Sequence, residues 1–257
     1  MHTIWFPDFG ELPAGLPELR EWIFYSFPHK PRLTGKCRVL SSGTWGLASL
    51  GKGNYGVREW NDLYNYYIKY AGIGTPGWRM MPDEYLHPYK TMKNFKEWYE
   101  RFPDMPVIPI IQFSKKKHCD IYLARKQIQF YWQYNPDRIC ISNPGFRCDE
   151  WLTELSFVSE MCKDMLGGPW IHVLGAGWDM FDITQYLKID TIDSIDSIAY
   201  YTAARDGVMW LPSLNIDSFK KGLCNCPACE SDVDAWARAA MHNAYVAQEV
   251  VKNYRTG

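Results

Sequence analysis

The sequence has 257 residues, of which 47% are hydrophobic and 22% charged, with a formal net charge of −1. These values are ordinary for a folded globular protein, and they argue against a disordered chain or a fibrous repeat. The near-zero charge excludes attraction to nucleic acid by the chain as a whole, so any phosphate contact has to come from a local basic patch. No apolar run reaches the roughly 18 residues of a membrane span, so we expect no membrane partner.

The amino-terminal residues 1–10 carry acid, proline and glycine where a signal peptide would need a basic start and an apolar centre. Of the eight cysteines, five are scattered singly along the chain and three crowd into six positions near its end. This distribution is typical of reduced thiols with one metal cluster rather than of a disulfide framework. We therefore expect a cytoplasmic protein.

Short apolar runs alternate along the chain with stretches of helical spacing. The runs comprise residues 37–40, 78–81, 107–111, 139–141, 170–174, 192–195 and 208–210. Continuous apolar character over so few residues indicates strands buried on both faces, as in a parallel sheet covered by helices. The helical stretches comprise residues 59–71, 91–101, 121–134, 149–166 and 233–252.

This alternation predicts an α/β fold, a (β/α)8 barrel of the TIM type that forms one domain over residues 1–257. A small zinc-binding subdomain over residues 222–246 is expected within it. An open doubly wound sheet is the alternative. The barrel is favoured because seven candidate strands are found and no glycine-rich phosphate fingerprint follows the first of them.

In parallel α/β folds, reactive groups gather beyond the carboxyl ends of the strands. The residues in this position are therefore the first candidates for a site. They are Ser41, Asp83, Gln112, Asn143, Gly175 and Asp196.

A metal cluster is predicted near the end of the chain. Cys224, Cys226 and Cys229 stand close together, and His242 follows on a helical stretch. Three thiolates and one imidazole are a donor set that zinc prefers in tetrahedral array, and four protein ligands leave no position open for substrate. We therefore expect a structural zinc ion, although chance crowding of cysteines is the alternative.

The aromatic content of 16% includes 12 Trp and 17 Tyr. Such rings either pack in the core or stack on nucleic-acid bases, and packing is the expected role for any single ring.

Several motifs, taken in order, resemble those of the queuine and archaeosine tRNA-guanine transglycosylase superfamily. They are the Pro82-Asp83-Glu84 element, the strand ending in Gln112, the turn at residues 174–177, the stretch at 192–197 followed by 204–207, and the cysteine cluster with His242 and Asn243. Together they span about residues 38 to 246. Each motif alone is weak, but their common order is specific.

The chain is most similar to the DNA-directed branch, the DpdA family, because members that act on tRNA are typically longer. This resemblance implies DNA as the partner, with tRNA the less favoured polymer, and a 7-deazaguanine base such as 7-cyano-7-deazaguanine as the incoming substrate. A phage source would suit the compact chain. The oligomeric state is left open, with a homodimer among the alternatives.

The resemblance also implies roles for individual residues. Asp196 would attack C1′ of the nucleotide, with Asp193 as the rival nucleophile, and Asp83 with Gln112 would read the base. Leu174, Gly175 and Asn143 would complete the substrate pocket. Read without the family pattern, the Asp-Ser repeat at 193–197 would be a strand end with a capping turn.

One departure bears on activity. Ser41 stands where the family has an aspartate that contacts the incoming base, and a hydroxyl cannot act as a carboxylate base near neutral pH. Ser41 therefore favours an alternative function, a non-catalytic zinc-containing barrel that serves as a nucleic-acid-binding or partner subunit. Residues 115–118 and 220–221 are candidate phosphate contacts, or simply solvated loops.

Overall fold

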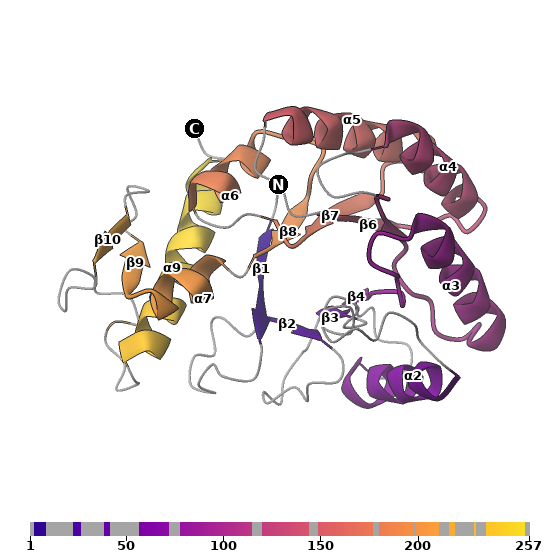
Figure 1. Cartoon of the computed structure of the whole chain (residues 1–257), viewed down its shortest axis with the longest axis horizontal. Coiled ribbons are helices and arrows are strands. Elements are labelled where there is room, and N and C mark those ends of the chain that lie inside the picture. Colours follow the sequence, from indigo (N-terminus) through magenta and orange to yellow (C-terminus); the bar gives the residue numbers. More distant parts are fainter. Residues whose placement is uncertain are drawn as a thin grey trace.

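A computed structural model describes the chain over residues 3–8, 23–26, 39–41, 57–71, 78–114, 120–143, 149–176, 180–197, 199–210, 216–218, 229 and 235–254. These residues form a mixed α/β structure, so the predicted fold class is confirmed at this level. Helices α3, α4 and α5 follow one another in an arc outside the strands (Figure 1). None of the helices in these ranges combines the length and apolar character of a membrane span.

Eight strands are joined in one sheet, in the order β4-β3-β2-β1-β8-β7-β6-β5. Every pairing between them is parallel. An isolated parallel bridge also joins Met80, next to β4, to Ile108, just before β5. The strands are β1 (Thr3–Asp8), β2 (Ile23–Ser26), β3 (Val39–Ser41), β4 (Trp78–Arg79), β5 (Ile110–Ile111), β6 (Arg138–Ser142), β7 (Trp170–Leu174) and β8 (Ser194–Asp196).

The predicted run at 208–210 forms a strand, but this strand does not belong to the parallel sheet. It is β9 (Val208–Trp210), which pairs antiparallel with β10 (Ile216–Ser218) in a separate ribbon. The prediction that this run extends the parallel sheet is therefore wrong. Strands β1 and β2, which were not among the predicted runs, complete the eight-stranded sheet.

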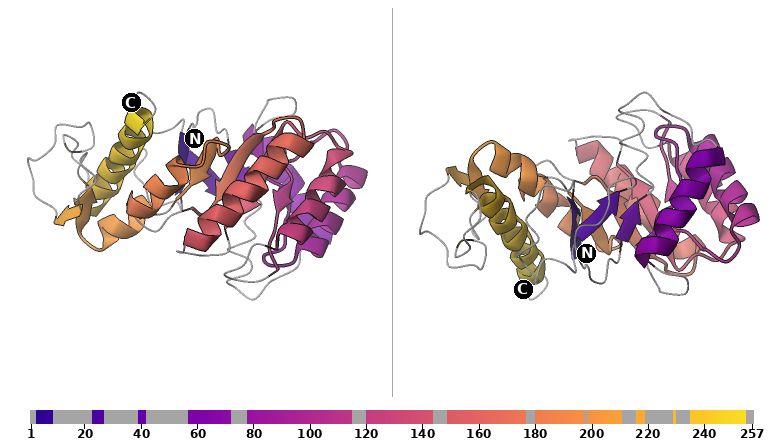
Figure 2. Two further views of the ribbon diagram at one scale, coloured as in Figure 1. Left: turned by 90° about the horizontal axis from the view of Figure 1, so that it is seen from above. Right: turned by 90° about the horizontal axis from the view of Figure 1, so that it is seen from below.

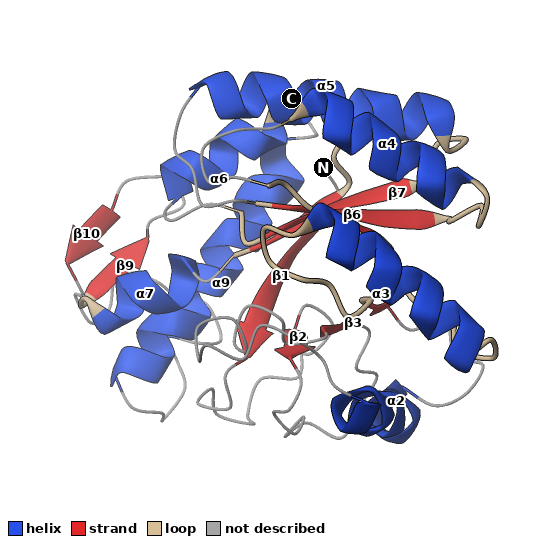
Figure 3. Cartoon of the chain, turned by 45° about the vertical axis from the view of Figure 1, so that its right-hand side comes forward, coloured by secondary structure: helices blue, strands red, loops and turns tan. Residues whose placement is uncertain are grey.

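The predicted helices are found close to their expected bounds. They are α2 (Val57–Ala71), α3 (Pro88–Arg101), α4 (Ile121–Trp132), α5 (Asp149–Met165) and α9 (Ala235–Tyr254), with the shorter α6 (Met180–Leu187) and α7 (Ala199–Arg205) in addition. A capping residue explains where helix α4 begins. The Asp120 carboxylate accepts the Leu123 N–H at 3.0 Å and caps α4. In the view of Figure 3, α4 and α5 lie above β6 and β7.

The core is aromatic where helices α2, α3 and α4 meet. Phe95 and Trp98 of α3 are fully buried, as are Tyr67 of α2 and Tyr131 of α4. Phe95 packs against Tyr131 with ring centroids 5.0 Å apart, in an edge-on arrangement. For these rings the predicted packing role is confirmed.

The carboxyl-terminal part forms a cluster at one end of the molecule. Helix α9 packs against α7, β9 and β1, and also contacts α6. Figure 2 shows α9 and the β9–β10 ribbon at this end, far from α3 and α4. Asn243 of α9 ties the cluster together, because its side chain accepts the Trp210 N–H at 2.7 Å and donates to the carbonyls of Val208 and Tyr200 at 3.0 and 3.2 Å.

Candidate active site and metal centre

The candidate residues lie at one edge of the sheet. Ser41 and Asp196 end strands β3 and β8, Gln112 and Asn143 come directly after β5 and β6, and Gly175 follows β7. Because all the strands run parallel, these positions meet at the carboxyl edge. The backbone of Ser41 is paired with that of Ser26 on β2, and its side chain lies outside the described part.

Asp196 is held by two donors on the same carboxylate oxygen. Its Oδ1 lies 3.1 Å from Nε2 of His172 and accepts the Gly175 N–H at 3.0 Å. The side chain is 8% exposed. Its backbone carbonyl also accepts the Ala176 N–H at 2.7 Å, so the end of β8 is fastened to the turn after β7.

The turn after β7 depends on a glycine. Gly175 has a φ of +64°, and although an added Cβ would meet nothing within 4 Å, this backbone conformation disfavours other residues. Asn143 fixes the turn from β6: its Nδ2 donates to Gly175 O at 3.1 Å and to the Tyr186 hydroxyl at 2.9 Å. Its backbone N–H donates to Leu174 O at 3.1 Å. The structure thus brings Asn143, Leu174, Gly175 and Asp196 together.

A second pair of candidates meets between β4 and β5. Gln112 Nε2 donates to Asp83 Oδ2 at 2.5 Å, and both side chains are buried. A carboxylate only accepts, so the amide nitrogen has to face Asp83 and the amide oxygen points away. Within the described part of the chain, that buried Gln112 Oε1 has no hydrogen-bond partner. This oxygen is therefore available to accept a hydrogen bond from a bound molecule.

Gln112 is positioned by a residue that the sequence did not reveal. Gln127 of α4 accepts the Gln112 backbone N–H at 2.9 Å and donates to the Gln112 carbonyl at 2.9 Å. Gln127 is fully buried, and its place on the buried side of α4 is the only sequence signal it gives. A buried amide on an otherwise apolar helix face requires a polar partner.

The two pairs lie on either side of strand β6 in the sheet. Cys140 of β6 lies between them in the sheet and is fully buried. Burial raises the pKa of its thiol well above the usual value, and the negative charges of Asp196 and Asp83 raise it further. Both carboxylates therefore act on the same buried thiol.

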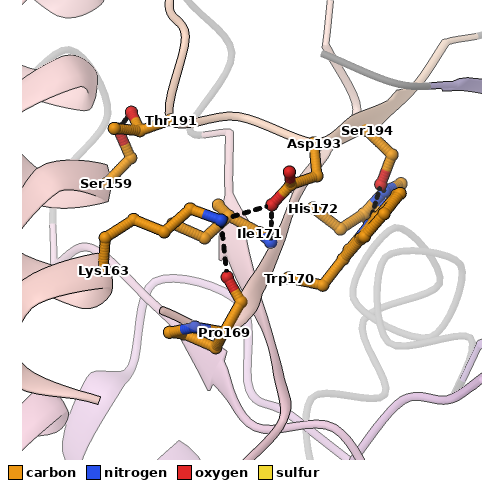
Figure 4. A network of polar contacts seen from close by, with 9 residues as sticks. All are labelled: Ser159, Lys163, Pro169, Trp170, Ile171, His172, Thr191, Asp193 and Ser194. Atoms are coloured by element: carbon orange, nitrogen blue, oxygen red, sulfur yellow. Dashed lines mark hydrogen bonds and ion pairs between the residues drawn. The ribbon is translucent and has the colours of Figure 1, made fainter. Parts of the chain in front are cut away.

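Asp193 lies apart from this site. Side chains alternate along a strand, so Asp193 and Asp196, three positions apart, point to opposite faces of the sheet. Asp193 Oδ2 contacts Lys163 Nζ of α5 at 2.7 Å and accepts the Ile171 N–H at 2.8 Å. Lys163 also donates to Pro169 O at 2.7 Å, as Figure 4 shows. Asp193 thus anchors a helix to the sheet.

His172 is a further buried group, and the sequence motifs do not include it. It lies in β7 in register with Ser194 of β8, and its Nδ1 is 2.8 Å from the Ser194 hydroxyl. Trp170 donates its indole N–H to the same hydroxyl at 2.9 Å. The signal was a histidine inside a buried run, two positions before Leu174 and therefore on the same face.

The predicted metal cluster is described in part. Cys229 Sγ and His242 Nδ1 lie 3.4 Å apart, and His242 Nε2 lies 2.5 Å from Trp210 O. A carbonyl only accepts, so the proton is on Nε2 and the Nδ1 lone pair faces the sulfur. Burial lowers the pKa of His242, opposed in part by the bond to Trp210. The lowered pKa and the proton on Nε2 leave the Nδ1 lone pair suited to bind a metal.

The other two predicted ligands, Cys224 and Cys226, lie outside the described residues, as do residues 115–118 and 220–221. Within the described ranges no group of three metal-binding side chains is found. The Cys229–His242 spacing nevertheless fits two ligands of one tetrahedral zinc, for which bond lengths of about 2.3 and 2.0 Å give an S···N separation of about 3.5 Å. The backbone carbonyl behind His242 is a typical second partner for such a ligand.

No protein-family model matches the chain, and no curated protein matches it either. The functional interpretation therefore rests on the motifs and on where their residues lie. Four of these residues are bonded in two pairs, Gln112 to Asp83 and Gly175 to Asp196, and each pair joins the ends of two consecutive strands.

Proposed function

We propose that the chain is a DNA guanine transglycosylase, which replaces guanine in DNA by a 7-deazaguanine base through a covalent intermediate on Asp196. The observation that carries this proposal is the pairing of motif residues at one sheet edge. Asp83 with Gln112 and Asp196 with Gly175 lie on either side of Cys140, whose thiol both carboxylates influence. Such a site combines base recognition with a nucleophile.

The fold we infer for this site is a closed (β/α)8 barrel. The bridge between Met80 and Ile108 supports it, because it connects the two outermost strands of the sheet. Backbone bonds from Ile108 N to Arg79 O at 2.7 Å and from Met81 N to Ile108 O at 3.2 Å reinforce this connection. In such barrels the carboxyl ends of the strands form the active-site mouth.

The Asp83–Gln112 pair would read the base. The Watson–Crick edge of guanine presents the N1–H and N2–H groups as adjacent donors, and Gln112 Oε1 and the Asp83 carboxylate are acceptors. A 7-deazaguanine has the same edge and differs only in its five-membered ring. One pocket can therefore accept both the leaving and the incoming base, which an exchange reaction requires.

Asp196 would carry the covalent step. Its carboxylate forms a bond to C1′ as the bond from C1′ to guanine N9 breaks, and guanine leaves after its anion takes up a proton from solvent. The incoming base then attacks C1′ through its own ring nitrogen, loses a proton and releases Asp196. No external energy source is needed, because the sugar stays activated on the enzyme. The target nucleotide has to be flipped out or single-stranded to reach a buried carboxylate.

A structural zinc ion would be held by Cys224, Cys226, Cys229 and His242. It would connect the cysteine segment to α9 and contribute to folding rather than to exchange. The orientation of His242, whose Nδ1 faces Cys229, supports this ligand set.

A second function is favoured by one residue. Ser41 ends β3 where the family has a proton-shuttling aspartate, so a barrel that binds nucleic acid without exchanging bases fits that position better. A tRNA-directed enzyme is a third alternative.

Base release separates these functions. The protein is incubated with DNA or tRNA that contains radiolabelled guanine, together with unlabelled 7-cyano-7-deazaguanine. We expect label to be released from DNA and retained by tRNA, with no release by Asp196→Asn. Release from tRNA alone would point to the third function. Binding of DNA without release from either polymer would overturn the enzymatic proposal in favour of the second.

A further inference from the structure

A chain of hydrogen bonds runs along one face of β7 and β8. It leads from the Trp170 indole to the Ser194 hydroxyl at 2.9 Å, from there to His172 Nδ1 at 2.8 Å, and from His172 Nε2 to Asp196 Oδ1 at 3.1 Å. In Figure 4 the rings of Trp170 and His172 converge on Ser194, apart from the Lys163–Asp193 pair. His172 and Ser194 are fully buried.

The two ends of this chain determine its direction. The indole N–H of Trp170 can only donate. Asp196 Oδ1 already accepts the Gly175 N–H at 3.0 Å, so it is an acceptor for His172 as well. His172 Nε2 therefore carries a proton. The remaining link is the Ser194 hydroxyl, which accepts from Trp170 and is free to donate to Nδ1.

Only one state of His172 satisfies every donor. In the neutral Nε2–H tautomer, Nδ1 accepts the Ser194 hydroxyl proton and the chain is complete. In the doubly protonated ring, Nδ1 would donate to Ser194, whose own hydroxyl hydrogen would have no acceptor among the described residues. A buried donor without an acceptor is costly. The hydrogen-bond pattern thus places a proton on Nε2 and makes Nδ1 the acceptor.

We propose that His172 is a positioning residue that holds Asp196 by Oδ1 and leaves Oδ2 to bond the substrate. This inference rests on the proposed function of Asp196 as the nucleophile. His172 and the Gly175 N–H both bind Oδ1, and within the described part of the chain no donor binds Oδ2. A fixed carboxylate presents one oxygen in one direction, which favours attack on a flipped nucleotide. Ser194 and Trp170 fix the ring in turn.

The hydrogen-bond chain is tested without any substrate. Protein labelled with 15N-histidine is studied by long-range 1H–15N NMR, and the His172 signals among the six histidines are assigned from their loss in His172→Gln. We expect one protonated nitrogen, Nε2, and one bare nitrogen, Nδ1, near neutral pH. In Ser194→Ala the preference for this tautomer should weaken. A doubly protonated ring, or a proton on Nδ1 alone, would overturn the inference.

The positioning role is tested by exchange kinetics with two variants. His172→Leu removes the donor to Oδ1, whereas His172→Gln replaces it by an amide N–H of similar reach. We expect kcat to fall by about tenfold to hundredfold in His172→Leu, the range that corresponds to one hydrogen bond to a charged group, and to recover largely in His172→Gln. The KM for the base should stay unchanged, because Asp83 and Gln112 read it.

The possible results separate the two proposals. If the wild type exchanges bases and His172→Leu keeps its kcat, the positioning role is overturned while the proposed function stands. If His172→Leu loses activity and His172→Gln does not recover it, His172 is merely structural, and the role is again overturned. If the wild type exchanges nothing, both the proposed function and the positioning role fail. The NMR result then bears only on the hydrogen bonds from Trp170 to Asp196.

Discussion

Asp193 precedes strand β8 and Asp196 ends it, on opposite faces of the sheet, and the two residues differ in partners rather than in burial. Measured over the whole residue, Asp193 is 8% exposed and Asp196 is 6% exposed. Asp193 is paired with the cationic Lys163, whereas Asp196 is bound by an imidazole and a backbone N–H. Lys163 offsets the charge of Asp193, whereas within the described part of the chain no lysine or arginine pairs with Asp196. The face toward the helices thus serves stability, and the opposite face is suited to chemistry.

The largest expected effect is on the exchange rate, when Asp196 is replaced. Asp196→Asn keeps the shape of the side chain but removes the charge that bonds C1′, so exchange should fall by about 10⁴-fold or more. The free energy of unfolding should change little. Both are measured on one preparation, by label release and by urea denaturation. A variant that unfolds readily yet retains exchange would reverse the roles assigned to the two faces.

The proposed zinc ion would act on stability rather than on exchange, so losing it should affect folding. Cys226→Ser removes one predicted ligand. Metal analysis should show less zinc in this variant than in the wild type, for which we expect about one zinc ion per chain. The melting temperature should drop by about 6–12 °C, the shift that roughly 3 kcal/mol gives for a chain of this size. A chelator should lower the melting temperature of the wild type and leave that of the variant unchanged. Equal stability with and without zinc would contradict the ligand assignment.

Asp193→Asn is the matched counterpart of Asp196→Asn. The variant leaves Lys163 without its carboxylate partner, and we expect the free energy of unfolding to fall by about 2 kcal/mol, less than for a fully buried pair. The exchange rate of the folded fraction should stay within about twofold of the wild type, a difference below about 0.5 kcal/mol. Loss of exchange without loss of stability would make Asp193 the nucleophile instead.

The smallest effect is expected at the turn after β7, where Gly175 contacts Asp196. Gly175→Ala imposes a positive φ on a residue with a Cβ, which costs about 1 kcal/mol of stability. Because Gly175 N–H also binds Asp196, kcat should fall modestly. Gly168→Ala is the control: Gly168 has a φ of +80° and open space around it, but precedes β7. Equal losses of kcat in both variants would show that the Gly175 contact is irrelevant to exchange.

Local patterns in the sequence predicted much of the fold. The runs that became β6 and β7 were continuous and apolar, and these strands are buried in the sheet. Strand β1 was missed because Pro7 and the neighbouring acid interrupt its apolar residues. The run at 208–210 looks like a parallel strand by composition, and only its antiparallel partner reveals its place.

The candidate site was predictable where position along a strand was enough. Asp196, Gly175 and Gln112 were found because each ends or follows a buried run. His172, Ser194 and Gln127 were missed because their roles depend on cross-strand register and helix packing, which a single sequence does not specify. The sequence also left Asp193 and Asp196 as rivals, since both stand in one Asp-Ser repeat.

The most direct test of the central claim is to trap the covalent intermediate. The wild type is incubated with guanine-containing single-stranded DNA, denatured, and digested for mass spectrometry of the protein–DNA species. We predict a glycosyl ester on Asp196 that is absent in Asp196→Asn, present in Asp193→Asn, and discharged by added 7-cyano-7-deazaguanine. An adduct on Asp193, or exchange that proceeds in Asp196→Asn, would contradict the account.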